Sequence, residues 1–420
     1  MRTTLLLIFS LFILTTSAQS ASEIAGFDKD YKFELYRPYP AEFRDTKFTP
    51  APKGYKPFYM SHLARHGSRW HSGFKTYTYP LDILEAAEKA GELTEVGKRY
   101  LADLRIIVDD ATNRDGELSP LGFEQHRSVA ERMVENYPEI FRKNCYIDAR
   151  STTVQRCILS MASAVRQISR MVPTSNIRME SSDDNGYLKA YAGLNSVKQD
   201  ARGLSDSLHY AYMPDIEPFL NRIFTKPQQG HDLKKFAHYS FLMGGILGST
   251  PIAEVPNLDY IFTEEERAGM WRASNIRRYA LTGPSKPFGK VIASGIYPFV
   301  ENVVTTADRA IKNGDEQATL RFAHDVTVIP FAYLLGIKCA NTVTDDWANI
   351  SYKWRINEVT PMGANIQIVF YRSKKSNDIL VKVLHNEREQ ILDSAVATPV
   401  ESVYYRWEDI KSHLLSQVGK

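Results

Sequence analysis

The feature that most constrains this chain is the stretch from residue 58 to residue 73, which reads FYMSHLARHGSRWHSG. Its first half is mostly apolar and predicts a buried β-strand. One short loop then carries Arg65, His66, Gly67 and Arg69. Guanidinium groups match phosphate oxygens in a bidentate manner, and positive charge around a histidine lowers its pKa and favours the neutral, nucleophilic form. A strand followed by a basic surface turn is the alternative, and this stretch alone supports both interpretations equally.

A second stretch, residues 318–329, reads ATLRFAHDVTVI and repeats this pattern. An apolar strand is expected to end directly at His324 and Asp325, and the apolar run over residues 326–335 predicts a helix. Ligand sites in open α/β sheets lie at the carboxyl ends of strands. We therefore expect the two motifs to meet over one crevice.

A third strand is expected over residues 145–149, followed by a helix that begins near residue 154. Arg156 falls in the first turn of that helix, where free N–H groups and the helix dipole favour an anion. This makes Arg156 a candidate for a third phosphate-binding arginine. Arg150, at the end of the strand, is a weaker candidate that would equally pair with a carboxylate.

Between these motifs, Ser119 and Pro120 predict the start of a helix, with serine as N-cap and proline at the first helical position. The helix is expected over residues 121–137 and carries His126. A lone histidine on a helix is more often structural than catalytic, so we favour the structural role for His126.

Residues 1–21 have the composition of a cleavable signal peptide: a short positive start, an apolar core over residues 5–14 and small residues at the cleavage position. The apolar core is too short for a confident membrane span. We therefore expect a secreted or periplasmic protein without a membrane anchor.

Removal of that segment leaves about 400 residues, enough for two domains or for one domain with large insertions. The 52 basic and 49 acidic side chains give a formal net charge of +3, which argues against a nucleic-acid partner. Neither CxxC, HExxH nor a glycine-rich nucleotide loop is present, so we expect no metal and no cofactor. The cysteines allow at most one disulfide; they are Cys145, Cys157 and Cys339.

The expected organisation is a core built from residues 22–180 and 288–420, with a mainly helical cap over residues 181–287 between them. The helices within residues 81–110 belong either to the core or to the cap side. For each basic side chain of the cap, a solvent-facing position is favoured over one in the crevice; these are Lys189, Lys198, Arg202, Arg272, Arg277 and Arg278.

Near the C-terminus, residues 365–371 and 379–384 alternate as strands of a hairpin, and residues 400–418 predict an amphipathic helix. Residues 28–56, rich in proline and aromatic side chains, are expected to wrap over the core.

These motifs, in this order, resemble the histidine acid phosphatase family, which is branch 2 of the histidine phosphatase superfamily. The resemblance is carried by RHGSR, GELSPLGFEQH, the Arg156 helix, HD after a buried strand, and PMGANIQIVFYR with a following NE. It covers nearly all of the mature chain and is strongest for phytase and multiple inositol polyphosphate phosphatase-like members. It implies an α/β fold with a mostly parallel central sheet flanked by helices, a phosphoglycerate-mutase-like core and an inserted helical cap.

The resemblance also implies a role for each motif residue. His66 is expected to be the nucleophile that forms a phosphohistidine, and Asp325 the general acid that protonates the leaving oxygen. The side chains expected to bind the substrate phosphate are Arg65, Arg69, Arg156 and His324. The substrate is expected to be a small phosphomonoester, and the oligomeric state is left open.

Two departures from the family pattern leave the substrate open. Many family members have a proline two residues after the second motif arginine, where this chain has His71. The inositol polyphosphate phosphatase branch commonly has His-Ala-Glu where this chain has His-Asp-Val over residues 324–326. Phytate and other inositol phosphates lead as substrates, and a broad acid phosphatase acting on sugar phosphates is the alternative.

Two further functions are disfavoured. A phosphoglycerate-mutase-like enzyme would share the RHG motif, but the signal peptide and the His-Asp motif argue against it. A non-catalytic phosphate-binding protein is disfavoured because every expected catalytic position is filled.

Overall fold

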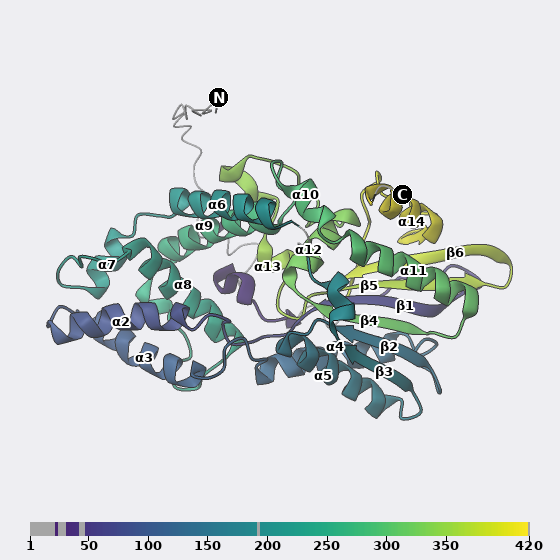
Figure 1. Cartoon of the computed structure of the whole chain (residues 1–420), viewed down its shortest axis with the longest axis horizontal. Helices are drawn as coiled ribbons and strands as arrows, with labels where there is room; N and C mark the ends of the chain where they lie inside the picture. Colours follow the sequence, from purple (N-terminus) through teal and green to yellow (C-terminus); the bar gives the residue numbers. More distant parts are fainter. Residues whose placement is uncertain (1–21, 24–30, 42–46, 191–193, 419–420) are drawn as a thin grey trace.

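The computed structural model describes residues 22–23, 31–41, 47–190 and 194–418 (Figure 1). The signal peptide expected over residues 1–21 lies outside the described residues. Figure 1 shows the strands gathered at one end of the molecule and the helices α2, α3 and α6–α9 at the other. Within the described residues, no helix combines the length and the apolar character needed to cross a membrane.

The described residues contain one sheet, in the order β3-β2-β4-β1-β5-β6-β7, with β8 paired to β6. The inner pairs β1–β4, β4–β2 and β2–β3 are parallel, and the strands from β5 onward are antiparallel. The expected α/β fold with mostly parallel inner strands is therefore confirmed. The strands are β1 Tyr55–Arg65, β2 Tyr146–Ser151, β3 Asn176–Ser181, β4 Ala318–Ala323, β5 Asn365–Ser373, β6 Ser376–His385, β7 Arg388–Glu389 and β8 Tyr404–Arg406.

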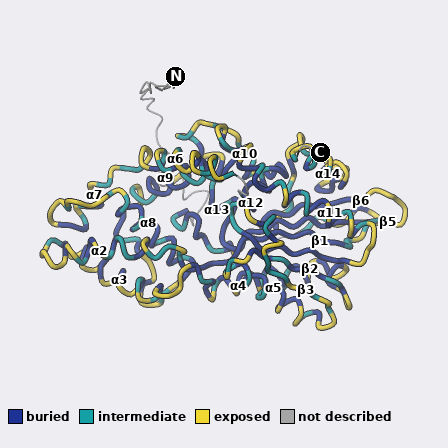
Figure 2. Tube along the Cα trace, in the orientation of Figure 1, coloured by how far each residue is buried: buried dark blue, intermediate teal, exposed yellow. Residues whose placement is uncertain are grey.

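Alternate residues of β1 face opposite sides of the sheet, as strand geometry requires. Met60 and Ala64 belong to a buried cluster with the helices α4 Pro120–Asn136 and α5 Gln155–Met171. Tyr59 and Leu63 belong to the cluster on the other face. That face is covered by α11 Tyr297–Asn313, α12 Asp325–Leu334 and α14 Trp407–Gln417. Figure 2 shows β1 buried along most of its length.

The helical end of the molecule is built by segments that are far apart in the sequence. The helices α2 and α3 pack against α8 and α7, and Thr94 donates a hydrogen bond to the carbonyl of Arg222 at 2.5 Å. These helices are α2 Lys75–Lys89, α3 Glu95–Ala111, α6 Asn195–Tyr212, α7 Glu217–Ile223, α8 Leu233–Ser249 and α9 Glu264–Thr282. The shorter elements are the helices α10 Gly289–Ser294 and α13 Ile356–Val359, and the 3₁₀ helices η1 Tyr31–Tyr36, η3 Asp183–Leu188, η4 Asp259–Ile261 and η5 Trp347–Tyr352.

Thus α2 and α3 lie on the cap side. From the sequence, both the core and the cap side were possible for them. One cluster of buried residues continues from α2 and α3 into the face of the sheet that α11 and α12 cover. The division into a core and a cap domain therefore stays a proposal.

The helix expected over residues 400–418 is correct only from Trp407 onward. Residues 404–406 form β8, and Tyr404 and Tyr405 pair with Lys382 and Val381 of β6. Aromatic side chains favour the pleated, half-buried surface of a sheet, so pairing along β6 overrides the helical pattern. The three cysteines are free thiols, so the one possible disulfide does not form.

The start of α4 agrees with the prediction. Ser119 is the N-cap, and its hydroxyl accepts from the N–H of Gly122 at 3.3 Å. The same hydroxyl donates to the carbonyl of Ser249, at the end of α8, at 2.7 Å. Ser119 therefore ties the start of a helix on the sheet to the end of a cap-side helix.

We predict that Ser119→Ala lowers the free energy of unfolding by about 1–2 kcal/mol, because it removes an N-cap and leaves a buried carbonyl without its donor. The measurement is urea unfolding at equilibrium. Ser128→Ala is the control, because the Ser128 hydroxyl lies on the same helix and bonds only the half-buried Glu124 carboxylate. Equal losses in the two variants would contradict the capping role.

Candidate active site

The ends of three parallel strands bring the sequence motifs together. In the register of β1 and β4, Arg65 lies opposite Ala323. The N–H of His66 donates to the carbonyl of Ala323 at 3.1 Å, and the N–H of Thr152, just after β2, donates to the carbonyl of Phe322 at 3.2 Å. The RHGSR loop, the His-Asp motif and the start of α5 therefore meet at one edge of the sheet, as the sequence predicts.

His66 is buried, with 2% of its surface exposed, and its orientation is fixed by the backbone. Its Nδ1 lies 2.9 Å from the carbonyl oxygen of Gly67. A carbonyl only accepts hydrogen bonds, so Nδ1 carries the proton and Nε2 keeps its lone pair. His66 is therefore held in the tautomer that a nucleophile requires.

The surroundings of His66 keep it neutral. Burial lowers the pKa of His66 well below its usual range, and Arg69, Arg156 and Arg65 lower it further. His324 lies across from it, with the two ring centroids 5.7 Å apart. Burial, and then Arg156, lower the pKa of His324 to about 4. The pocket thus combines positive guanidinium groups with neutral imidazoles.

The three expected arginines have donor groups to spare. Arg65 is fully buried, and its Nη1 donates to the carbonyls of Leu35 at 3.0 Å and Thr360 at 2.5 Å. Its Nε and Nη2, and the Nε of both Arg69 and Arg156, are buried without a hydrogen-bond partner among the described residues. Buried donors of this kind are rarely left unsatisfied, and a tetrahedral anion with several oxygens would satisfy them.

Asp325 is the first residue of α12, with His324 as the N-cap. Burial alone would raise the pKa of Asp325. Arg65, and after it Arg278, His324 and Arg69, outweigh that effect and hold the pKa below its usual value. Its place at a helix N-terminus favours the same ionised state.

Arg278 of α9 is the residue that the sequence analysis missed. A solvent-facing position was favoured for it, and this prediction is wrong. Only 17% of its side chain is exposed, and its Nε donates to Glu34 at 2.9 Å. Its charge acts on both Asp325 and Arg65, so it lies beside the RHGSR and His-Asp motifs. Because 213 residues separate Arg278 from Arg65 in the sequence, no local pattern indicates that they are neighbours.

The 3₁₀ helix η1 contacts two of the arginines of this site, Arg65 and Arg278. Glu34 is buried in a strained backbone conformation, with φ of 48° and ψ of −128°. Its carboxylate accepts from Arg278 and from the hydroxyl of Ser274 at 2.9 Å. The neighbouring carbonyl of Leu35 accepts from Arg65. One short segment therefore positions two arginines.

The next residue, Tyr36, positions the RHGSR loop. The guanidinium of Arg69 lies 5.4 Å from the Tyr36 ring centroid, within the range of a cation–π contact. The Tyr36 hydroxyl hydrogen-bonds Nδ1 of His71. At the position where the family often has proline, His71 thus links the loop to η1. Burial, and then Arg69, lower the pKa of His71 to about 3.

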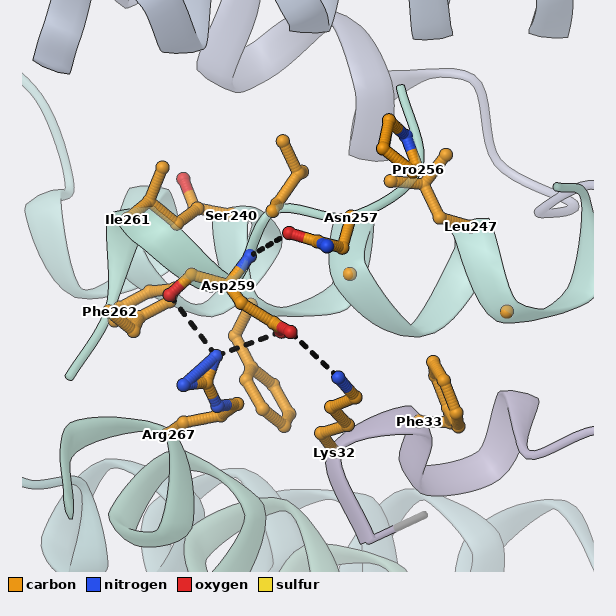
Figure 3. A pocket seen from close by; sticks show the side chains of 14 residues that line it. Lys32, Phe33, Ser240, Leu247, Pro256, Asn257, Asp259, Ile261, Phe262 and Arg267 are labelled. Atoms are coloured by element: carbon orange, nitrogen blue, oxygen red, sulfur yellow. Dashed lines mark hydrogen bonds and ion pairs between the residues drawn. The ribbon is translucent and has the colours of Figure 1, made fainter. Parts of the chain in front are cut away.

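The other end of η1 is fixed to the cap side. Asp259 accepts from Lys32 at 2.8 Å and from Arg267 at 2.9 Å, and Figure 3 shows these side chains converging beside a pocket. Gly248 of α8 allows the ring of Phe33 to pack closely, since a Cβ at residue 248 would lie 2.6 Å from that ring. The segment is therefore held between α8, α9 and the catalytic loop.

Gly67 is required for a reason that the sequence does not show. A Cβ at Gly67 would lie 2.5 Å from the carbonyl oxygen of Gly122, and a Cβ at Gly122 would lie 2.2 Å from the carbonyl oxygen of Ser68. The RHGSR loop packs directly on the start of α4, and two glycines make that approach possible.

Other residues considered from the sequence have structural roles. Arg150 pairs with Asp148 and Glu180, which is the alternative that the sequence left open. Asn386 and Glu387, the NE of the resemblance, bond the backbone of Asn365 and the side chain of Arg132. These residues do not contribute side chains to the pocket around His66.

The fold and the sequence both match known proteins. A sequence model of the histidine phosphatase superfamily (branch 2) matches residues 178–386, which include the His-Asp motif. The chain belongs to branch 2 of the histidine phosphatase superfamily. The matched range starts after β2, so the RHGSR loop lies outside it.

Several solved structures are similar to this chain, at identities that show a shared fold. A Bifidobacterium longum multiple inositol polyphosphate phosphatase, in complex with inositol hexasulfate, has 20% identity and a TM-score of 0.77, over 92% of this chain and 98% of that chain. A phytase from D. castellii has 17% identity and a TM-score of 0.70, over 92% of this chain and 85% of that chain. A comparison with curated proteins gives no match.

His126 is buried, and its ring centroid lies 5.5 Å from that of Phe322 in β4. Burial lowers its pKa to about 4, although a hydrogen bond to the Arg65 backbone partly opposes this. The unfolded chain, in which a histidine has a pKa of about 6.5, therefore binds an extra proton at intermediate pH. Its contribution to stability is lost as the pH falls from about 6.5 to about 4.

We predict that His126→Gln makes the free energy of unfolding less dependent on pH. Between pH 6 and pH 5, the slope should fall by about one proton, or about 1.4 kcal/mol per pH unit. Urea unfolding at several pH values measures this slope. His231→Gln, which changes an exposed histidine, is the control for the substitution itself. An unchanged slope in His126→Gln would show that this histidine already binds a proton in the folded protein.

Proposed function

We propose that this protein is a phosphomonoester hydrolase that acts through a phosphohistidine on His66, with inositol polyphosphates such as phytate as its substrate class. One observation carries the proposal. His66 is buried and neutral with a free Nε2, and it lies among arginines that each keep at least one buried donor without a hydrogen-bond partner in the described residues. The family that the chain belongs to supports a phosphatase activity.

In the first step, Arg65, Arg69, Arg156 and His324 would bind the phosphoryl oxygens. Nε2 of His66 attacks phosphorus, a P–N bond forms, and the bond from phosphorus to the ester oxygen breaks. Asp325 gives its proton to that oxygen, which leaves as an alcohol. Phosphoryl transfer depends mainly on positioning and charge stabilisation, which these side chains supply.

Asp325 must carry a proton for this step, although its pKa is lowered in the free protein. A bound phosphate dianion opposes the field of the arginines and favours the protonated carboxyl group. Substrate binding therefore prepares the acid. We expect activity in the acidic to near-neutral range for this reason.

In the second step, water attacks the phosphohistidine. The Asp325 carboxylate, which lost its proton in the first step, accepts a proton from the water. The P–N bond breaks, His66 returns to its neutral form, and phosphate leaves. The two steps replace one difficult displacement by two easier ones.

The similar structures support inositol polyphosphates as the substrate class, because they are those of a multiple inositol polyphosphate phosphatase and a phytase. The aspartate directly after His324 supports the alternative, an acid phosphatase acting on sugar phosphates. Phosphate release from phytate, glucose 1-phosphate and p-nitrophenyl phosphate, measured side by side, discriminates between them. The N-terminal sequence supports secretion, and Edman sequencing of the exported protein would locate the cleavage position.

We predict that His66→Ala abolishes turnover and leaves the protein folded, because the variant lacks the atom that receives the phosphoryl group. Rapid quenching of the wild type with labelled substrate should trap an acid-labile phosphoenzyme. An acid-stable phosphoserine, or full activity in the variant, would refute the role of His66. Circular dichroism of the variant controls for folding.

We predict that Asp325→Asn affects substrates according to their leaving group. An inositol or sugar alkoxide needs a proton in the transition state, whereas nitrophenolate leaves without one. The variant should hydrolyse alkyl phosphates roughly 10²–10⁴-fold more slowly and p-nitrophenyl phosphate with a much smaller loss. The measurement is kcat/KM for both substrates. Equal losses on the two substrates would assign Asp325 to phosphate positioning instead.

A further inference from the structure

A pocket of about 520 Å³ lies at the edge of the sheet opposite the catalytic motifs. It is formed by the amino end of β1 and the carboxyl end of β5, which are antiparallel neighbours. From Lys56 to Arg65 the strand spans roughly 30 Å, at about 3.3 Å per residue. The pocket is therefore separate from the site around His66.

The lining of this pocket is strongly basic. It contains one carboxylate, Glu139, and five cationic side chains, which are Lys56, Arg142, Arg372, Lys374 and Lys375. None of these five forms an ion pair with a carboxylate of the described residues. The pocket beside β2 and β3 differs, because its arginines pair with Asp148, Glu180 and Glu316. Among the described residues that line the pocket, the positive charge at the amino edge of β1 is thus opposed by one carboxylate alone, that of Glu139.

Arg372 is the most constrained of the five cations. Its guanidinium lies 3.5 Å from the ring centroid of Phe58, and its Nη2 donates to the carbonyl of Ile311 at 3.4 Å. Its Nε is buried without a hydrogen-bond partner among the described residues. Burial lowers its pKa, since no nearby anion opposes the loss of solvent. Burial of this guanidinium carries a desolvation free energy, which an anionic ligand would offset.

The remaining lining leaves room for a ring-shaped ligand. Pro57 and Phe58 provide apolar surface, and the glycines Gly54 and Gly314 leave space beside the cations. Gly314 has no side chain to cover the Arg372 guanidinium. A Cβ at residue 314 would lie 3.9 Å from Nη1 of Arg372. The volume is within the range of small-molecule sites.

We propose that this pocket is a second ligand site that binds a small, multiply charged anion of the phosphate-ester or sulfate-ester class. Several cations around one space match several anionic groups carried on one ring, such as those of a phosphorylated cyclitol or sugar. The apolar surface would contact the C–H groups of that ring. The site does not depend on the proposed hydrolase activity, because it shares no residue with the pocket around His66.

The test is calorimetric titration with inositol hexasulfate at low ionic strength. The wild type should bind one molar equivalent more of inositol hexasulfate than Arg372→Gln or the double variant Lys374→Gln/Lys375→Gln. If a variant still binds this equivalent, its dissociation constant should rise about tenfold for each cation removed. The double lysine variant changes only exposed residues, so it separates binding from folding if Arg372→Gln is unstable. Lys89→Gln/Lys290→Gln removes two exposed charges elsewhere and is the matched control.

The outcomes distinguish this inference from the proposed function. Equal binding by wild type and both pocket variants would overturn it, as would an equal loss in the control variant. Sedimentation with vesicles that carry phosphorylated inositol headgroups, without binding of free inositol hexasulfate, would also overturn the assignment to a free small anion. Hydrolysis of p-nitrophenyl phosphate should be unchanged in the pocket variants. If the proposed function is wrong, the wild type itself will not hydrolyse p-nitrophenyl phosphate.

Discussion

The structure depends on one electrostatic arrangement, in which several guanidinium groups converge on an imidazole that stays neutral. Burial removes the water that would stabilise a charged His66, and the arginines add repulsion, so the protonated form is disfavoured twice. The same positive field lowers the pKa of Asp325. A site of this kind has little to gain from a neutral ligand. It is suited to a dianion, which would compensate the charge and, in the mechanism proposed above, favour the protonated form of Asp325.

Keeping like charges together requires support, and the structure supplies it with backbone groups and aromatic rings more than with carboxylates. Arg65 is held by two carbonyls, and Arg69 lies over Tyr36. Glu34 is the exception, since its carboxylate positions Arg278 at the far side of the pocket. These contacts leave other donors of Arg65 and Arg69 without a hydrogen-bond partner among the described residues. The strained backbone at Glu34 fits this view, because strain of this kind persists where the surroundings fix a functional geometry.

The sequence predicted the inner sheet, most of its flanking helices and the meeting of the three motifs, because strands ending in charged residues leave a local pattern. Arg278, Glu34 and Tyr36 left no such pattern, since their importance comes from contacts between separate segments, which for Glu34 and Arg278 are 244 residues apart. Gly67 was singled out, but its reason, contact with Gly122, depends on packing. Residues 404–406 were predicted to be helical, because their pairing with β6 is a contact between separate segments that the local pattern does not show. The sequence therefore indicated the motif residues themselves, but it did not indicate the residues that position them.

The central claim is that His66 is neutral and carries its proton on Nδ1. Nuclear magnetic resonance of the protein labelled with ¹⁵N-histidine measures this directly, with His66→Ala to assign the signal. The account predicts that the free protein shows the Nδ1–H tautomer at neutral pH and keeps an unprotonated Nε2 well below pH 6.5. A titration of His66 near the ordinary histidine pKa of about 6.5, or a proton on Nε2 at neutral pH, would contradict it.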